Sequence, residues 1–198
     1  MYPHQYNPAN DNLDISGGVN EYTDSTIGER ATYDENGNIT RYIDSFGKTT
    51  VNTYDSQNHL VKSVSGNEIT RFVYNGGDNL LQVIYPDQYN PADDNLNLSA
   101  ESPVDTYANS AVGDRYTYDA DGRVLTYTDK YGNVTTNTYD ALNRVLAVNT
   151  VCDDSTNNVS KSYTYNNMGW MTNKSSNGTE TSIEYVALGR VTKEWGPN

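Results

Sequence analysis

Residues 32–39 read Thr-Tyr-Asp-Glu-Asn-Gly-Asn-Ile, and this stretch decides the fold because the chain repeats it. Close copies stand at residues 53–60, 117–124 and 138–145, and degenerate copies are centred on Tyr74, Tyr165 and Tyr185. Self-similarity at a fixed short period is the sequence signature of a repeat architecture. Positions within each copy are counted from its tyrosine, which is position 0.

Each copy predicts a β-hairpin with a tight turn. Position +4 holds residue types that tolerate a positive φ. Position +6 is apolar in every copy, so it and the tyrosine flank the turn and are expected to share one face of the sheet. The tyrosines are Tyr33, Tyr54, Tyr74, Tyr118, Tyr139, Tyr165 and Tyr185, and the +4 residues include Gly37, Asn58, Gly122, Asn143, Gly169 and Gly189.

In the four clear copies an aspartate follows the tyrosine, at Asp34, Asp55, Asp119 and Asp140. An aspartate that opens a type I turn can bond backbone two residues further on, and an αL residue then closes the loop. These carboxylates are therefore interpreted as turn-formers and not as catalytic groups. Two further predictions follow: Gly37 and Gly122 have φ > 0, and Tyr33, Tyr54, Tyr118 and Tyr139 stack as one layer on one face.

The hairpins fall into two groups, each preceded by an insert rich in Asn, Pro and Asp. Residues 1–29 are the first insert, 30–84 three hairpins, 85–114 the second insert and 115–198 four hairpins. The inserts share Tyr-Pro-x-Gln-Tyr-Asn-Pro-Ala, beginning at Tyr2 and Tyr85. The strands are short and rich in Thr, Val and Tyr, and no helical stripe appears. The fold class predicted is all-β: tandem hairpins in one continuous, curved antiparallel sheet, a segment of a spiral shell or solenoid.

Composition excludes several classes of protein. The formal net charge is −13, with only 13 scattered Lys and Arg residues, which argues against binding of nucleic acid. No apolar run is long enough for a transmembrane helix, and no signal peptide opens the chain. Cys152 is the single cysteine, so an intrachain disulfide is excluded and the thiol is interpreted as unpaired, near a loop. The 18 tyrosines and the constant register favour an ordered chain over a disordered one.

The motif Tyr-Asp-x-x-Gly-Arg-Val, seen in full at residues 118–124, resembles the YD-repeat (Rhs-repeat) family, and the resemblance covers nearly the whole chain. It implies hairpin ribbons that spiral into a hollow shell, as in bacterial Rhs and Tc toxins, wall-associated proteins and teneurins. In the toxins the shell encloses a toxic domain released at an Asp-Pro motif. This chain has no Asp-Pro, so that cleavage is not carried over. Family shells are much longer, so the chain is expected to be an excerpt or a short member.

Candidate chemical sites are few. His4 and His59 have no nucleophile or ligand pattern beside them, and an exposed role is expected for both. Oxygen-rich loops in the inserts offer hard ligands, so calcium bound by Asp11, Asp14, Asp93 and Asp94 is one alternative to no cofactor at all. No catalytic residue is assigned, and the protein is not expected to be an enzyme.

Two functions remain open. The first is structural: wall of a β-shell around a toxin or effector domain, in a secreted or cell-surface bacterial protein. The second is an extracellular adhesion module that binds a glycan or a protein. In either case the terminal strands are expected to pair with the rest of a longer chain or, end to end, with other copies, because exposed strand edges recruit strands.

Overall fold

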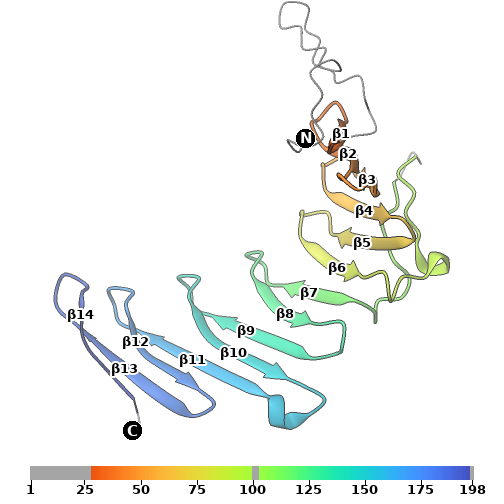
Figure 1. Ribbon diagram of the computed structural model, residues 1–198. Coiled ribbons are helices and arrows are strands. Elements are labelled where there is room, and N and C mark those ends of the chain that lie inside the picture. The colour runs from red at the N-terminus through yellow and green to blue at the C-terminus, as the bar shows by residue number, and fades with distance from the viewer. Residues whose placement is uncertain (1–27, 100–102, 197–198) are drawn as a thin grey trace, which may run out of the picture. The chain divides into compact units, whose positions relative to one another are not determined.

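The computed structural model describes residues 28–99 and 103–196, and its strands follow one another in the sheet as they do in the sequence. Neighbouring strands are antiparallel (Figure 1). The all-β prediction of tandem hairpins in one antiparallel sheet is confirmed. The strands are β1 (Arg30–Tyr33), β2 (Ile39–Ile43), β3 (Thr49–Tyr54), β4 (Leu60–Ser65), β5 (Glu68–Tyr74), β6 (Leu80–Ile84), β7 (Asp114–Tyr118), β8 (Val124–Thr128), β9 (Val134–Tyr139), β10 (Val145–Val151), β11 (Val159–Tyr165), β12 (Met171–Ser176), β13 (Thr179–Tyr185) and β14 (Val191–Trp195).

The helical content of the described residues is two single-turn 3-10 helices, η3 (Pro91–Asp93) in the second insert and η4 (Ser155–Asn157) in the loop between β10 and β11. No helix in residues 28–99 and 103–196 is long and apolar enough to cross a membrane. The chain divides into two compact units, which are described separately: Met1–Asp78 with Ile84–Asn109, and Asn79–Val83 with Ser110–Asn198.

The motif turns have the geometry that their residue types predict. In the first turn the Asp34 N–H donates to the Asn38 carbonyl (3.0 Å), and the Gly37 N–H donates to the Asp34 carbonyl (3.1 Å). The predicted positive φ of Gly37 and Gly122 is confirmed, at 85° and 77°. All other +4 residues also have positive φ, including the non-glycine Asn58, Asp78 and Asn143. Tyr33 lies directly opposite Ile39, and a bulge next to this pair re-aligns the strands.

The same turn also closes strands at the opposite edge of the sheet. The Asp44 N–H donates to Lys48 and the Asp129 N–H donates to Asn133, each across a glycine with positive φ, Gly47 or Gly132. These turns lack the preceding tyrosine. The tyrosine is therefore not a requirement of the turn itself.

Burial differs between the units. In the first unit Val61 and Ile84 are fully buried, and Tyr107 of the second insert is nearly so, because the insert packs beside β4 and β5 (Figure 1). In the second unit no described residue after Asp114 is buried. A single layer of strands has little core to stabilise it. Contacts from one hairpin to the next must therefore contribute much of the stability there.

Candidate functional site

The aspartate at position +1 ties the turn backbone to the side chain at position +5. Asp140 accepts hydrogen bonds from the Leu142 and Arg144 backbone N–H groups with Oδ1 and from Arg144 Nε with Oδ2 (2.6 Å). The bond from the Arg144 side chain, followed by those from the backbone, lowers the pKa of Asp140. The same carboxylate-to-(+5) contact recurs at Asp34–Asn38, Asp55–His59 and Asp119–Arg123.

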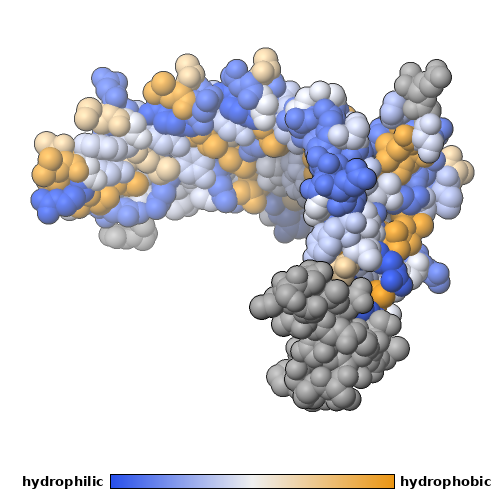
Figure 2. Space-filling view, turned by 90° about the horizontal axis from the view of Figure 1, so that it is seen from above, coloured by the Kyte–Doolittle hydropathy of each residue, from blue (hydrophilic) through white to orange (hydrophobic). Residues whose placement is uncertain are grey.

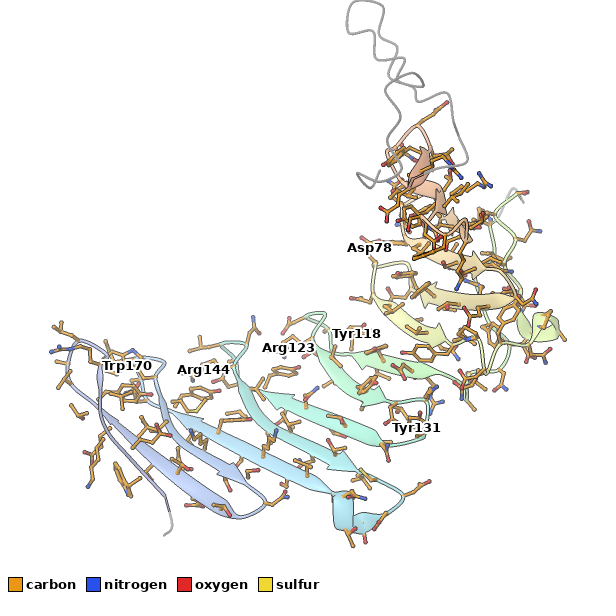
Figure 3. All side chains as sticks on the ribbon, viewed as in Figure 1. Asp78, Tyr118, Arg123, Tyr131, Arg144 and Trp170 are labelled. Atoms are coloured by element: carbon orange, nitrogen blue, oxygen red, sulfur yellow. The ribbon has the colours of Figure 1, made fainter. Side chains whose placement is uncertain are left out.

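The +5 side chain then covers the tyrosine ring of the next hairpin. Arg123 lies over Tyr139 (4.8 Å to the ring centroid) and Arg144 over Tyr165 (4.5 Å). Figure 3 shows Arg123, Arg144 and Trp170 along one edge of the second unit, with Tyr131 at the opposite edge. Two aromatic versions of the contact are Trp170 on Tyr185 (5.3 Å) and His59 on Tyr74 (4.5 Å, stacked). Cation–π and ring–ring contacts of this kind stabilise by about 0.5–1.5 kcal/mol each.

The tyrosine hydroxyl makes the third contact between hairpins, since it donates to the +6 carbonyl of the preceding hairpin. These hydrogen bonds are Tyr54 to Ile39 (3.1 Å), Tyr118 to Leu80 (2.7 Å), Tyr139 to Val124 (2.9 Å), Tyr165 to Val145 (2.9 Å) and Tyr185 to Met171 (2.7 Å). We call these contacts at a junction the tyrosine clasp. They run from the +1 aspartate through the +5 side chain to the ring and hydroxyl of the next tyrosine.

One sequence-based expectation needs correction at the clasp, and another stays a prediction. That the motif tyrosines form one layer on one face of the sheet stays a prediction, and the rings of Tyr74, Tyr139, Tyr165 and Tyr185 each meet the +5 side chain of the preceding hairpin. A tyrosine hydroxyl that reaches the +6 carbonyl places its ring beside that side chain. His59 was expected to be exposed, yet its side chain is only 19% exposed because Asp55 and the Tyr74 ring hold it.

A buried charged cluster fixes the second insert onto the first unit. Arg71 of β5 is fully buried and donates to Asp94 (Nε, 2.8 Å), to Asp105 (Nη2, 2.6 Å) and to the Val61 and Phe72 carbonyls. Lys62, directly opposite Arg71, donates to Asp94 (2.9 Å). Burial would raise the pKa of Asp94, but the bonds from Lys62 and Arg71 outweigh it and hold that pKa far below its usual range. Burial raises the pKa of Asp105, which Arg71 offsets only in part.

The contacts of this cluster weigh against a calcium ion at Asp94 of the second insert. The Asp94 carboxylate is taken by two cations and by the Tyr89 hydroxyl (2.7 Å), so its charge is already neutralised. Asp93 accepts from the Asn90 side chain instead. No group of three or more acidic, His or Cys side chains suited to a metal occurs in residues 28–99 and 103–196. Asp11, Asp14 and His4 lie outside the described residues.

Cys152 has a free thiol beside the loop that precedes η4, as its sequence context predicts. Its Sγ contacts the Asn157 carbonyl at 3.6 Å. Asp154 caps η4 through the Thr156 N–H (3.0 Å), which is a structural role. The arrangement of these groups supports turns and caps rather than catalysis.

Comparison with known proteins agrees with this geometry. Residues 33–68, which contain two motif turns, match the family model described as RHS Repeat. This stretch of the chain therefore carries an Rhs repeat. No curated protein sequence is similar enough to the chain to count as a relative. Among solved structures, the Rhs-repeat chain is similar to the crystal structure of TcdB2-TccC3-Cdc42, with a TM-score of 0.53 and 14% identity over 83% of this chain.

A second similar structure is TcdB2-TccC3 without its hypervariable C-terminal region, with a TM-score of 0.52 and 13% identity, again over 83% of this chain. In both cases the Rhs-repeat chain spans about a tenth of the length of the matched protein (10%). At this identity the similarity shows the fold alone.

The functional role of position +5 was not predicted from the sequence, although the sequence contains a signal for it. Position +5 holds a long planar or cationic side chain in most hairpins, a regularity like that of the tyrosine and the aspartate. No regular repeat position marks the residues of the buried charged cluster, which are Arg71, Lys62, Asp94 and Asp105. They are far apart in sequence, and only the folded position of the insert brings them together.

Proposed function

We propose that this Rhs-repeat chain is a structural segment that contributes wall to a β-shell, within a secreted or cell-surface bacterial protein whose shell encloses a toxin or effector domain. The observation that supports the proposal best is the tyrosine clasp. Its contacts join successive hairpins, and in the second unit they do so without a buried core after Asp114, which suits a wall one strand-layer thick. The similarity of fold to TcdB2-TccC3 agrees with this role.

Shell wall is also a role that needs no catalytic group, and the carboxylates of Asp94, Asp119 and Asp140, whose pKa values are lowered, are engaged in turns and ion pairs. Its partners are further hairpins, either of a longer chain or of other copies, which pair with the terminal strands. The test is the coding sequence on both sides of the chain. We expect further Tyr-Asp hairpins followed by a segment that varies between strains. Flanking sequence with a cell-wall anchor and no enclosed domain would contradict the shell.

A second candidate function is adhesion, favoured by one cleft in the first unit. The cleft has a volume of about 570 Å³ and lies between the second and third motif turns and the insert. Tyr54, Tyr74, Gln57 and Asn75 line it, a mixture of rings and amides of the kind that binds sugars. Screening the chain against a glycan array tests this candidate. Binding that disappears on Tyr74→Ala, with the fold retained, would favour adhesion over the shell.

A further inference from the structure

One register joins the successive motif hairpins of the described chain. The residue at +8 of one hairpin lies opposite the residue at −3 of the next, and +9 lies opposite −4. The +8/−3 pairs are Arg41–Val51, Lys62–Arg71, Gln82–Arg115, Thr126–Thr136, Ala147–Ser162 and Asn173–Ser182. The alignment does not depend on the length of the connection between two hairpins, so the same motif positions meet at each junction.

One of these recurring contacts joins position +5 of a hairpin to position +4 of the next, which is the left-handed residue of the turn. Three of the six junctions have a polar side chain at this +4, and there a nitrogen of the preceding +5 side chain lies against its oxygen. The nitrogen-to-oxygen distances are 2.9 Å for Asn38 to Asn58, 3.6 Å for His59 to Asp78 and 2.6 Å for Arg123 to Asn143. The +4 side chains therefore do more than tolerate the turn.

The other three junctions have glycine at this +4, and the space beside each glycine faces the same neighbour. A Cβ placed on Gly122 would lie 4.0 Å from Asn79 Oδ1. A Cβ on Gly169 would lie 3.8 Å from Arg144 Nη1, whereas one on Gly189 would lie only 3.0 Å from the Trp170 ring. The +5 side chain thus decides how much room the next +4 residue has, and Trp170 leaves none for a side chain.

Arg144 leaves room for a side chain at the next +4 but meets no acceptor there. Among the residues that the structure describes, its Nη1 is buried without a hydrogen-bond partner. Nη1 of Arg123 donates instead to the Asn143 side chain and to the Asp140 carbonyl. Both arginines bind the +1 aspartate of their own turn and cover the next tyrosine ring. The two junctions differ in the next +4 residue, which is Asn143 after Arg123 and Gly169 after Arg144.

We propose that position +4 is a specificity-determining residue of the wall, which acts together with the +5 side chain of the preceding hairpin. A donor at +5 is complemented by asparagine or aspartate at the next +4, whereas tryptophan at +5 admits only glycine. Glycine after Arg144 leaves a buried donor unsatisfied, which costs free energy. The proposal rests on the shell function proposed above, and it names the residue pair that determines which hairpin stably follows which.

Gly169→Asn tests the pairing, because asparagine tolerates a left-handed φ, as Asn143 does at 63°. Gly132→Asn is the matched control, since Gly132 closes a turn of the same kind with a φ of 92° and has nothing within 4 Å of an added Cβ. Urea unfolding of the full chain is followed by tryptophan fluorescence, because both tryptophans lie in the second unit. We expect the unfolding constant of Gly169→Asn to be about fivefold smaller than that of Gly132→Asn, as one recovered hydrogen bond implies.

Changing the +5 residue locates the partner of the new side chain. In an Arg144→Ala background, Gly169→Asn and Gly132→Asn should have equal effects on stability. Gly189→Asn should destabilise the parent chain, and this cost should fall when Trp170→Arg supplies a donor in place of the ring. The remaining tryptophan, Trp195, then reports unfolding.

Three results would each overturn the proposal. The first is no advantage of Gly169→Asn over Gly132→Asn, the second an advantage that persists without Arg144, and the third a cost of Gly189→Asn that Trp170→Arg leaves unchanged. None of these results affects the shell function, which the flanking coding sequence tests separately.

Discussion

Single residues decide the turns of this chain. An aspartate binds the backbone N–H groups of the loop, and the residue three positions later takes a left-handed conformation that closes it. Glycine adopts this conformation without strain, whereas asparagine and aspartate tolerate it, which is why these three types alternate at position +4.

Gly122 gives a direct test of this account. Its φ is 77°, so a β-branched residue is strained there whatever space surrounds it. We expect Gly122→Val to lower the free energy of unfolding by about 1–2 kcal/mol, measured by urea titration. Gly76→Val is the matched control, because Gly76 is also in a motif turn with open space but without a left-handed φ. Equal losses in the two variants would contradict the role of backbone strain.

The hydrogen bond from the tyrosine hydroxyl of the clasp can also be tested at a single residue. Tyr139→Phe keeps the ring under Arg123 but removes the donor to the Val124 carbonyl. We expect a loss of about 1 kcal/mol in the free energy of unfolding. The control is Tyr33→Phe, since the Tyr33 side chain is 62% exposed and its substitution should change stability by less than about 0.5 kcal/mol. A larger effect at Tyr33 than at Tyr139 would refute the clasp.

Hairpins are joined to one another by contacts that run along one edge of the sheet. The +1 aspartates contribute to these contacts as charged carboxylates, which accept hydrogen bonds from the turn backbone and from the +5 side chain. Arg144 Nη1 is buried and has no hydrogen-bond acceptor. The matching atom of Arg123 reaches the Asn143 side chain (2.6 Å) and the Asp140 carbonyl.

Acid should therefore loosen these junctions. The pKa of Asp140 is lowered in the folded chain, so its contribution is complete above the unfolded value near 3.8 and is lost as the pH falls below it. We expect Asp140→Asn to be less stable than the parent at pH 7 and close to it at pH 2, by denaturant midpoints. Asp121→Asn changes a mostly exposed carboxylate at another turn tip and should show no such convergence. A stability difference that stays constant with pH would argue against the carboxylate's role.

Sequence reasoning reached the hairpins because every determinant of the turn is local. Asp34, Gly37 and Ile39 lie within six residues of one another, and turn chemistry alone explains each of them. It missed the contact of Tyr139 with Arg123, because that contact depends on how two successive hairpins align, which no local residue type determines. It also left calcium open as one alternative at Asp94, since an oxygen-rich loop has the same sequence whether its charge meets a metal ion or a buried arginine.

At the scale of the whole molecule, the two units are stabilised differently. The first has the cluster of Arg71, Lys62, Asp94 and Asp105, with the insert covering β4 and β5. The second has junction contacts and no buried residue after Asp114. On the visible face in Figure 2, hydrophobic residues form scattered patches among hydrophilic ones.

Removing the buried cation should separate the two kinds of stabilisation. Arg71→Ala leaves Asp94 and Asp105 with less compensation, and breaking a buried pair in this way costs about 3–5 kcal/mol. Hydrogen exchange should then rise in β4, β5 and residues 103–109, while β9 to β13 keep their protection. Arg144→Ala should do the reverse and expose only strands of the second unit. Uniform loss of protection in both variants would show that the units are not stabilised independently.

The constant register between hairpins has a practical consequence. β12 and β13 are joined through Asn177 and Gly178 alone, whereas residues 85–113 lie between β6 and β7, and the strand alignment is the same in both places. The connection at Asn177 and Gly178 is therefore a natural place to graft foreign sequence. An epitope or a small enzyme inserted there would be displayed at a known edge of the sheet, and several such grafts along the chain would be spaced at fixed intervals set by the strands.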